Sequence, residues 1–361
     1  MSDVALVVEG SYPYVTGGVS EWTQQLVEGL PDVSFSIVSL GAAGRPRYDL
    51  PANVADLVDL EVDPDTGATS GELPDAAVYH ALATGSAGVV AAAAARARGS
   101  KFILSEHGIA WLEARLGIVG CKGSLKGSVT PATVEAQARR AYAEADAITA
   151  VCGWSAHMQH SLGGRGSRVI QNAVPAAKLT RTGGAEPLVG FVGRVVEVKD
   201  VLGFLEACRL VADELPSARF VVAGPVDQDP AYAERCHRRA DELSLEVTFT
   251  GSTDPRSWYE RLDALVLTSR SEAQPLVALE AMAAGIPVVA TAVGGCPELL
   301  GGRGLLTRPG DPRGTANAVL RVLRDEALRE RITAAALRRV EREHRPDRLF
   351  AAYSRLYEDA T

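Results

Sequence analysis

Two carboxylates, Glu272 and Glu280, stand eight residues apart in the stretch SEAQPLVALEAMAAGIPVVAT, residues 271–291. The first lies in a polar stretch, and the second lies among apolar residues that otherwise favour burial. Proline is common in the first turn of helices, so Pro275 predicts a helix that begins directly after it. The unpaired amides and the dipole of such a helix start attract phosphate. The segment therefore suits a ligand with hydroxyl groups on both sides of a diphosphate, which is the layout of a nucleoside diphosphate sugar.

The spacing of two glutamates has a plainer alternative, in which Glu280 is a surface residue of an amphipathic helix and Glu272 a loop charge. A second segment, GFVGRVVEVKD, bears on the choice because it places Gly193, Arg194 and Lys199 around another helix start. Arginine offers a planar fork and lysine a point charge, and the two together suit the oxygens of a diphosphate leaving group. A glycine–arginine turn alone is more often structural.

The composition limits the classes of protein and partner. A chain of 361 residues with 47% hydrophobic content is long enough for two domains with ordinary cores. The net charge of -8 gives no broad electrostatic reason to bind nucleic acid or an acidic membrane. No run approaches the roughly 20 apolar residues of a transmembrane helix, and the N-terminal residues do not resemble a signal peptide. With five scattered cysteines, we expect a reduced, cytoplasmic protein without a transmembrane segment.

Short β-branched runs alternate with longer Ala/Leu/Arg-rich stretches, which is typical of βαβ units and parallel sheets. The strands expected in the first half are 4–8, 35–40, 76–80, 101–104 and 147–151, and those in the second half are 188–192, 219–223, 247–250, 264–268 and 287–291. Helices are expected near 18–30, 86–98, 132–144, 200–214, 230–243 and 276–284, and through 313–358 with a break near 345–346.

A segment without a periodic apolar face, residues 172–188, predicts a linker between two doubly wound units. We therefore expect an N-terminal Rossmann-like, acceptor-side domain at 1–178 and a C-terminal, nucleotide-sugar-binding domain at 185–345. Residues 346–361 are expected to form a final helix. In open α/β sheets ligands bind at the carboxyl ends of the strands, so the predicted site lies between the domains. The glycine-rich run at 120–128 predicts a mobile loop.

Six motifs occur in an order that resembles the retaining glycosyltransferases of family 4. They are GGV (17–19), EHG (106–108), VIQNAVP, GR…KD, the segment with both glutamates, and GGCPE (294–298). The stretches EGSYPYVTGGVSEWTQQL, HALATG, SEHGI and AGPVDQDP resemble the PelF-like branch of that family. The resemblance spans nearly the whole chain. It implies an α/β protein with the GT-B fold, two Rossmann-like doubly wound domains facing across a cleft, and a C-terminal helix that returns to the N-terminal domain.

The resemblance also implies an activity. A hexose, glucose in the PelF-like branch, would move from a nucleoside diphosphate sugar, UDP-glucose, to a hydroxyl of a small-molecule or glycan acceptor in polysaccharide or glycoconjugate synthesis. No metal or other cofactor is expected. Peripheral association with a membrane synthesis complex is compatible with this activity. The family often has Gly-Phe-Gly after its first glutamate, whereas this chain has Ala273-Gln274-Pro275, a change that the PelF-like branch shares.

Residue roles follow from the resemblance as well. Arg194 and Lys199 would hold the diphosphate, Glu280 the ribose and Glu272 the donor hexose, while His107 would lie beside the donor sugar. The catalytic set is therefore His107, Arg194, Lys199 and Glu272. The remaining donor-binding candidates are Gly17, Gly18, Gly193, Ala273, Gln274, Pro275, Leu276 and Glu280. The acceptor-side candidates are His80, Glu106 and Arg115, although a structural histidine at 80 and a buried carboxyl at 106 remain open alternatives.

Two D-x-D triplets, 63–65 and 227–229, resemble the metal-diphosphate signature of a different glycosyltransferase fold. The first lies in a Pro/Gly/Thr loop without a flanking apolar strand. At the second, Arg194 and Lys199 already supply the positive charge that a metal would bring, so we expect no metal at either. A dehydrogenase would need G-x-G-x-x-G after the first strand, which EGSYPYVTGG lacks. A non-enzymatic nucleotide-sugar-binding protein and a nucleotide-sugar 2-epimerase remain alternatives.

Overall fold

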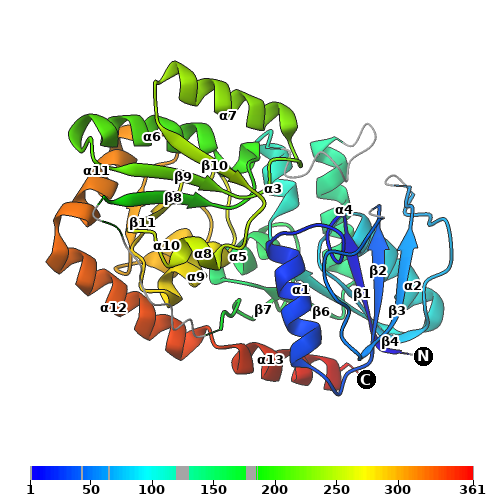
Figure 1. The fold of residues 1–361 in the computed structure, drawn as a ribbon. Helices are drawn as coiled ribbons and strands as arrows, with labels where there is room; N and C mark the ends of the chain where they lie inside the picture. Colours follow the sequence, from blue (N-terminus) through cyan, green and yellow to red (C-terminus); the bar gives the residue numbers. More distant parts are fainter. Residues whose placement is uncertain are drawn as a thin grey trace. The chain divides into compact units, whose positions relative to one another are not determined.

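The computed structural model describes residues 2–41, 44–63, 66–118, 130–175, 184 and 186–360. The chain divides into two compact units (Figure 1), of which unit 1 comprises Met1–Asn172 with Pro346–Thr361 and unit 2 comprises Ala173–Arg345. The predicted loop at 120–128, Asp65 of the first D-x-D triplet and most of the predicted linker lie outside the described residues.

Unit 1 is built on a seven-stranded sheet in the order β3-β2-β1-β4-β5-β6-β7. All pairings between its named strands are parallel. Because the strand order reverses beside β1, the carboxyl ends of β1 and β4 flank a topological switch point, where open α/β sheets bind ligands. The strands are β1 (Ser2–Glu9), β2 (Phe35–Leu40), β3 (Val54–Leu60), β4 (Ala76–Ala81), β5 (Lys101–Glu106), β6 (Ala147–Ala150) and β7 (Arg168–Val169).

The helices of unit 1 begin and end where their sequences favour it. Helix α4 starts at Pro131, a favourable first-turn residue, and the Thr130 hydroxyl caps it by accepting from the Thr133 amide at 3.2 Å. Helix α2 ends at Gly99, which has the left-handed conformation common after helices. The set is α1 (Gly18–Gly29), α2 (Ser86–Arg98), α3 (Ala110–Arg115), α4 (Pro131–Glu144), α5 (Gly153–Ser161) and α13 (Pro346–Glu358).

The last helix, α13, packs on unit 1 beside α1 (Figure 1). Its two buried tyrosines enter a polar cluster in the sheet: the Tyr357 hydroxyl lies 2.8 Å from His80 Nδ1, and the Tyr353 hydroxyl lies 3.1 Å from Ser105 Oγ. Tyr353 also packs edge-on against the Trp22 ring of α1. The helix therefore completes the core of unit 1, in agreement with the return that the resemblance implies.

Unit 2 repeats the design with a six-stranded parallel sheet in the order β10-β9-β8-β11-β12-β13. Its strands are β8 (Leu188–Val192), β9 (Arg219–Ala223), β10 (Val247–Gly251), β11 (Ala264–Leu267), β12 (Val288–Thr291) and β13 (Leu305–Thr307). Its helices are a short 3-10 turn (Glu197–Lys199), α6 (Val201–Glu214), α7 (Pro230–Glu242), α8 (Arg256–Tyr259), α9 (Leu276–Ala283), α10 (Cys296–Leu300), α11 (Pro312–Arg324) and α12 (Glu326–Glu343). Its switch point lies between β8 and β11.

The predicted fold class is confirmed, because both halves are doubly wound parallel α/β units. Each of the ten expected strands is present. The sequence missed β3, β7 and β13 and the short helices α3, α5, α8 and α10. No helix among the described residues is both long enough and apolar enough to cross a membrane.

Candidate functional site

In unit 2 the loops at the carboxyl ends of β8 and β9 pack backbone against backbone. Gly193 follows β8 directly, and Gly224, with a φ of 153°, follows β9. A Cβ at Gly224 would overlap the carbonyl oxygen of Gly193, so only glycine allows this approach. The next residue, Arg194, donates from Nη1 to Gln228 Oε1 at 2.9 Å. The predicted diphosphate arginine therefore lies beside the second D-x-D triplet.

That triplet has a structural role. Asp229 caps α7 by accepting from the Tyr232 amide at 3.2 Å, and Pro230 follows as the first residue of the helix. Across the described residues, no group of three His, Cys, Asp or Glu side chains is arranged to hold a metal ion. Asp229 and Gln228 thus each have a hydrogen-bond partner within unit 2.

Lys199 and Glu272, separated by 73 positions, meet in the fold. Lys199 Nζ lies 2.6 Å from Glu272 Oε1, and the Glu272 side chain is only 8% exposed. The approach is set by backbone ties, because the Thr268 hydroxyl at the end of β11 donates to the Asp200 carbonyl at 2.7 Å. Asp200 in turn caps α6 by accepting from the Gly203 amide. The structure therefore joins the predicted diphosphate lysine to the predicted sugar carboxylate.

The GGCPE motif supports the loop that carries Glu272. The Gly295 amide donates to the Glu272 carbonyl at 3.1 Å. Gly294 has a φ of 54°, and a Cβ there would overlap the same carbonyl oxygen. The residue must therefore be glycine for the loop to keep this position.

Helix α9 begins at Leu276, directly after Pro275, as the sequence predicts. The first amides of a helix have no acceptor within it, so they can receive an anion. Glu280 lies on the second turn of α9, where its Oε2 accepts from the Tyr259 hydroxyl at 2.6 Å. Ala273, Gln274 and Pro275 are buried in the loop that precedes the helix. The donor-side candidates of unit 2 thus share the carboxyl edge of one sheet, where Arg194 contacts Gln228 and Glu280 contacts Tyr259.

In unit 1, Glu106 ends β5 and is fully buried. Its carboxyl group accepts from the Tyr142 hydroxyl, from Gln159 Nε2 at 3.1 Å and from Thr84 Oγ1 at 3.1 Å. Burial raises its pKa to about 7, and these hydrogen bonds only partly oppose the rise. The contacts favour the alternative of a buried structural carboxyl.

His107 follows Glu106 and is half-buried, with its ring centroid 4.3 Å from that of Trp22. Its Nε2 atom is buried and has no hydrogen-bond partner among the described residues. Burial lowers the pKa of His107 to about 4, so the ring is neutral near pH 7. Gly17 and Gly18 stand at the start of α1, the helix that carries Trp22. The structure thus places His107, Gly17 and Gly18 near one end of the unit 1 sheet.

His80 is enclosed, with Nε2 2.7 Å from Ser105 Oγ and Nδ1 2.8 Å from the Tyr357 hydroxyl. The side chain is 0% exposed, and burial lowers its pKa to about 3. These contacts favour the structural alternative for His80 over contact with an acceptor.

His80 is expected to make folding depend on pH. An unfolded histidine binds a proton near pH 6.5 and the folded His80 only near 3, so the unfolded state binds more protons and the free energy of unfolding falls below pH 6.5. The cost is up to about 1.4 kcal/mol per pH unit. We expect His80→Gln to flatten the wild-type slope between pH 6.5 and 4 in urea denaturation, and His157→Gln, at an exposed position, to keep it. Equal slopes in the two variants would contradict the assignment.

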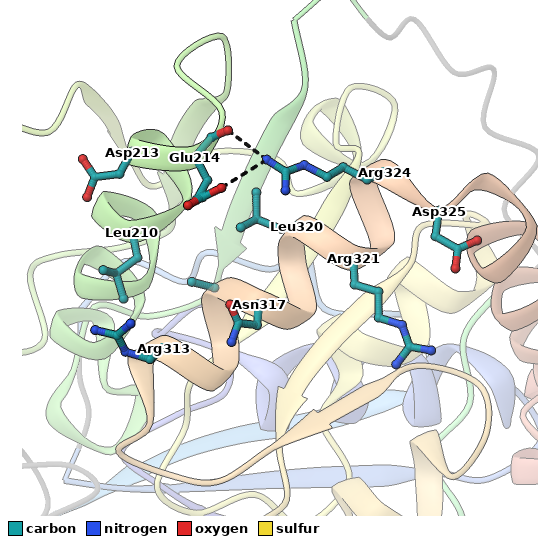
Figure 2. Close-up of a pocket in the computed structure, with 10 residues that line it drawn as sticks. Leu210, Asp213, Glu214, Arg313, Asn317, Leu320, Arg321, Arg324 and Asp325 are labelled. Carbon is teal, nitrogen blue, oxygen red and sulfur yellow. Dashed lines mark hydrogen bonds and ion pairs between the residues drawn. The ribbon is translucent and has the colours of Figure 1, made fainter.

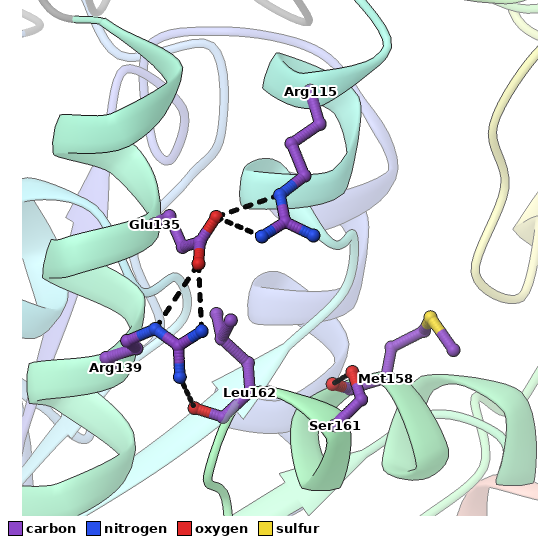
Figure 3. Close-up of polar contacts among 6 residues, drawn as sticks. All are labelled: Arg115, Glu135, Arg139, Met158, Ser161 and Leu162. Atoms are coloured by element: carbon purple, nitrogen blue, oxygen red, sulfur yellow. Dashed lines mark hydrogen bonds and ion pairs between the residues drawn. The ribbon is translucent and has the colours of Figure 1, made fainter.

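Arg115 belongs to an ion-pair network on the surface of unit 1 (Figure 3). Its guanidinium group pairs with Glu135 of α4 and lies over the Trp111 ring, 5.2 Å from the centroid. Glu135 also accepts from Arg139, which donates to the Leu162 carbonyl as well. The network ties α3, which follows the EHG motif, to α4. In this arrangement Arg115 supports the position of α3, and its contact with an acceptor stays a prediction.

A groove of about 650 Å³ lies on unit 2 between α6 and α11 (Figure 2). None of the predicted site residues lines it. Glu214 accepts from Arg324 across the groove, and Asp213 pairs with Arg209 of its own helix. The groove combines charged side chains of both signs.

Comparison with known proteins agrees with this geometry. Residues 186–325 match the family model described as Glycosyl transferases group 1, and residues 2–70 and 64–167 match a domain of unknown function, DUF3492. Sulfoquinovosyl transferase SQD2 of Arabidopsis thaliana is 35% identical over 163 residues, which cover 44% of this chain and 30% of that protein. D-inositol 3-phosphate glycosyltransferase of Mycolicibacterium smegmatis is 35% identical over 183 residues, covering 48% and 41%. The chain thus spans less than half the length of these relatives.

Two solved structures share the fold along nearly the whole chain. Sucrose-phosphate synthase from Thermosynechococcus elongatus has a TM-score of 0.79 at 18% identity, with 99% of this chain and 98% of that chain covered. Anabaena HepE in complex with UDP-glucose has a TM-score of 0.79 at 18% identity, with 99% of each chain covered. Two Rossmann-like units with these neighbours define a GT-B fold. Residues 186–325 resemble the group 1 glycosyl transferases.

Proposed function

We propose that the protein is a retaining glycosyltransferase of family 4, in its PelF-like branch, that moves glucose from UDP-glucose to a hydroxyl of a small-molecule or glycan acceptor. The contact of Lys199 with Glu272 at the edge that also carries the start of α9 is the observation that carries this proposal. A cation, a carboxylate and helix-start amides together suit the diphosphate and the hexose of one donor. The solved structures of HepE in complex with UDP and glucose, and with UDP-glucose, support the choice of donor.

The proposed chemistry needs no protein nucleophile. The departing phosphate accepts the proton of the acceptor hydroxyl, while Arg194 and Lys199 stabilise the charge that develops on the diphosphate. Glu272 orients the hexose through its hydroxyl groups, and Glu280 holds the ribose. Because the two cations supply this charge stabilisation, we propose a reaction that is independent of metal ions.

Ligand binding and product formation together test the proposal. We expect UDP and UDP-glucose to raise the melting temperature in a thermal-shift screen of nucleoside diphosphates and their sugars, since a ligand at 100 times its Kd adds about 2.7 kcal/mol to the free energy of unfolding. UDP-glucose with candidate glycan acceptors should yield an α-linked product in the presence of EDTA. A protein that binds these ligands but shows neither transfer nor slow hydrolysis of the donor would favour the non-enzymatic alternative. Formation of the epimer from UDP-GlcNAc alone would favour the 2-epimerase.

A further inference from the structure

Glu272 uses one of its two oxygens for contacts within the protein. Its Oε1 atom accepts from Lys199 Nζ at 2.6 Å and from the Ser269 hydroxyl at 2.6 Å. Its Oε2 atom has no hydrogen-bond partner within the described residues. A carboxylate anchored through one oxygen keeps the other directed and available for a ligand hydroxyl. A bound diphosphate would compete with Glu272 for Lys199, which is the predicted diphosphate cation, but not for Ser269. Ser269 is therefore the partner that can anchor Glu272 while a donor is bound.

Ser269 is itself held rigidly. It lies two residues after the end of β11, is 0% exposed, and its carbonyl accepts from the Thr291 hydroxyl of β12 at 2.5 Å. A hydroxyl on a fixed backbone loses little freedom when it forms a hydrogen bond, so it fixes its partner effectively. Its position thus transfers the rigidity of two core strands to the Glu272 carboxylate.

A parallel arrangement holds Glu280. Tyr259, the last residue of α8, is 2% exposed and donates from its hydroxyl to Glu280 Oε2 at 2.6 Å. Burial and the neighbouring carboxylate raise the pKa of Tyr259, which keeps this hydroxyl protonated and able to donate. Each predicted donor carboxylate therefore has one buried hydroxyl as its anchor.

We infer that Ser269 and Tyr259 are positioning residues that divide donor recognition, with Ser269 serving the hexose through Glu272 and Tyr259 serving the ribose through Glu280. This inference rests on the proposed function. Positioning of a reacting group affects the rate when the group must be held in one geometry. The loss of a hydrogen bond to a charged group changes a binding affinity or a reaction rate about ten- to hundredfold.

Removing one hydroxyl at a time separates the two roles. The measurements are the Kd of UDP and of UDP-glucose by calorimetry, and kcat and KM for transfer. Ser269→Ala should leave the Kd of UDP within about twofold and lower kcat/KM for UDP-glucose about ten- to hundredfold. Tyr259→Phe should weaken UDP and UDP-glucose by the same factor, about tenfold or more, because both ligands carry the ribose. Ser269→Thr, which retains the hydroxyl, should restore most of the transfer rate.

A matched control removes a buried hydroxyl elsewhere in unit 2 without touching a predicted donor carboxylate. Thr315→Val deletes the hydrogen bond to the Asp311 carbonyl and should lower the melting temperature without the difference between UDP and UDP-glucose. The inference is overturned if Ser269→Ala and Tyr259→Phe change both ligands in the same ratio, or if Thr315→Val reproduces the sugar-specific loss. A wild-type protein that binds neither UDP nor UDP-glucose would instead refute the proposed function.

Discussion

Lys199→Ala is expected to abolish the stabilisation that UDP gives to the wild-type protein. The lysine is the cation in direct contact with Glu272 at the edge where α9 begins, and its removal takes a full positive charge from the proposed diphosphate site. Without ligand, the variant should also lose up to about 3 kcal/mol of unfolding free energy, because Glu272 is left largely buried without its ion-pair partner. Thermal shifts with and without UDP measure both effects.

A double variant distinguishes loss of binding from loss of folding. In Lys199→Met/Glu272→Gln no buried charge is left unpaired, so the unfolding free energy should recover toward the wild-type value while the response to UDP remains absent. Lys101→Ala is the matched control, since that lysine forms an exposed ion pair with Asp146 in unit 1 and should keep the full UDP shift. Equal UDP shifts in Lys199→Ala and the wild type would remove Lys199 from the site.

The second large effect is expected for Glu272→Gln, which should reduce transfer about a hundredfold or more while UDP binding does not weaken. Glutamine keeps the volume and can still accept from Ser269, but it no longer offers a charged acceptor to the hexose hydroxyls. Because the glutamate shares Lys199 with the proposed diphosphate, its neutralisation should leave UDP affinity unchanged or raise it.

Steady-state transfer and UDP calorimetry on the same preparation test this expectation. Asp229→Ala provides a control, since that side chain caps α7 and its loss should lower stability by about 1 kcal/mol without a selective effect on transfer. A preserved turnover number in Glu272→Gln, or a loss of UDP affinity as large as the loss of transfer, would contradict a role on the sugar side.

The regular elements could be predicted because their sequences carry simple patterns. Strands such as β1 and β11 are continuous apolar runs, and α2 and α4 are long Ala-rich segments bounded by turn residues. Strand β3 was missed because VADLVDL, at an edge of the sheet, carries two exposed aspartates that interrupt its apolar pattern. Short helices such as α8 carry too few residues to show a period.

Only those site residues that belong to a local sequence pattern could be predicted. The position of Glu280 on α9 and of Lys199 before α6 followed from local helix-start signals. The partners of Glu272, Glu280 and Arg194 did not, because Ser269, Tyr259 and Gln228 are common residue types that no sequence pattern marks as anchors of a charged side chain. The one signal that pointed toward Ser269 is its place just beyond a buried strand, where side chains reach the carboxyl edge.

The dependence of unit 1 on helix α13 has a consequence for synthesis on the ribosome. The sheet of unit 1 is translated first, but Trp22, Phe35 and His80 contact Tyr353 and Tyr357 of the last helix. Unit 2 is one continuous stretch of sequence and can close its core as soon as Arg345 has emerged. Unit 1 is translated before unit 2, but we therefore expect it to complete its core after unit 2. Its incomplete core should remain accessible to chaperones until α13 has been synthesised.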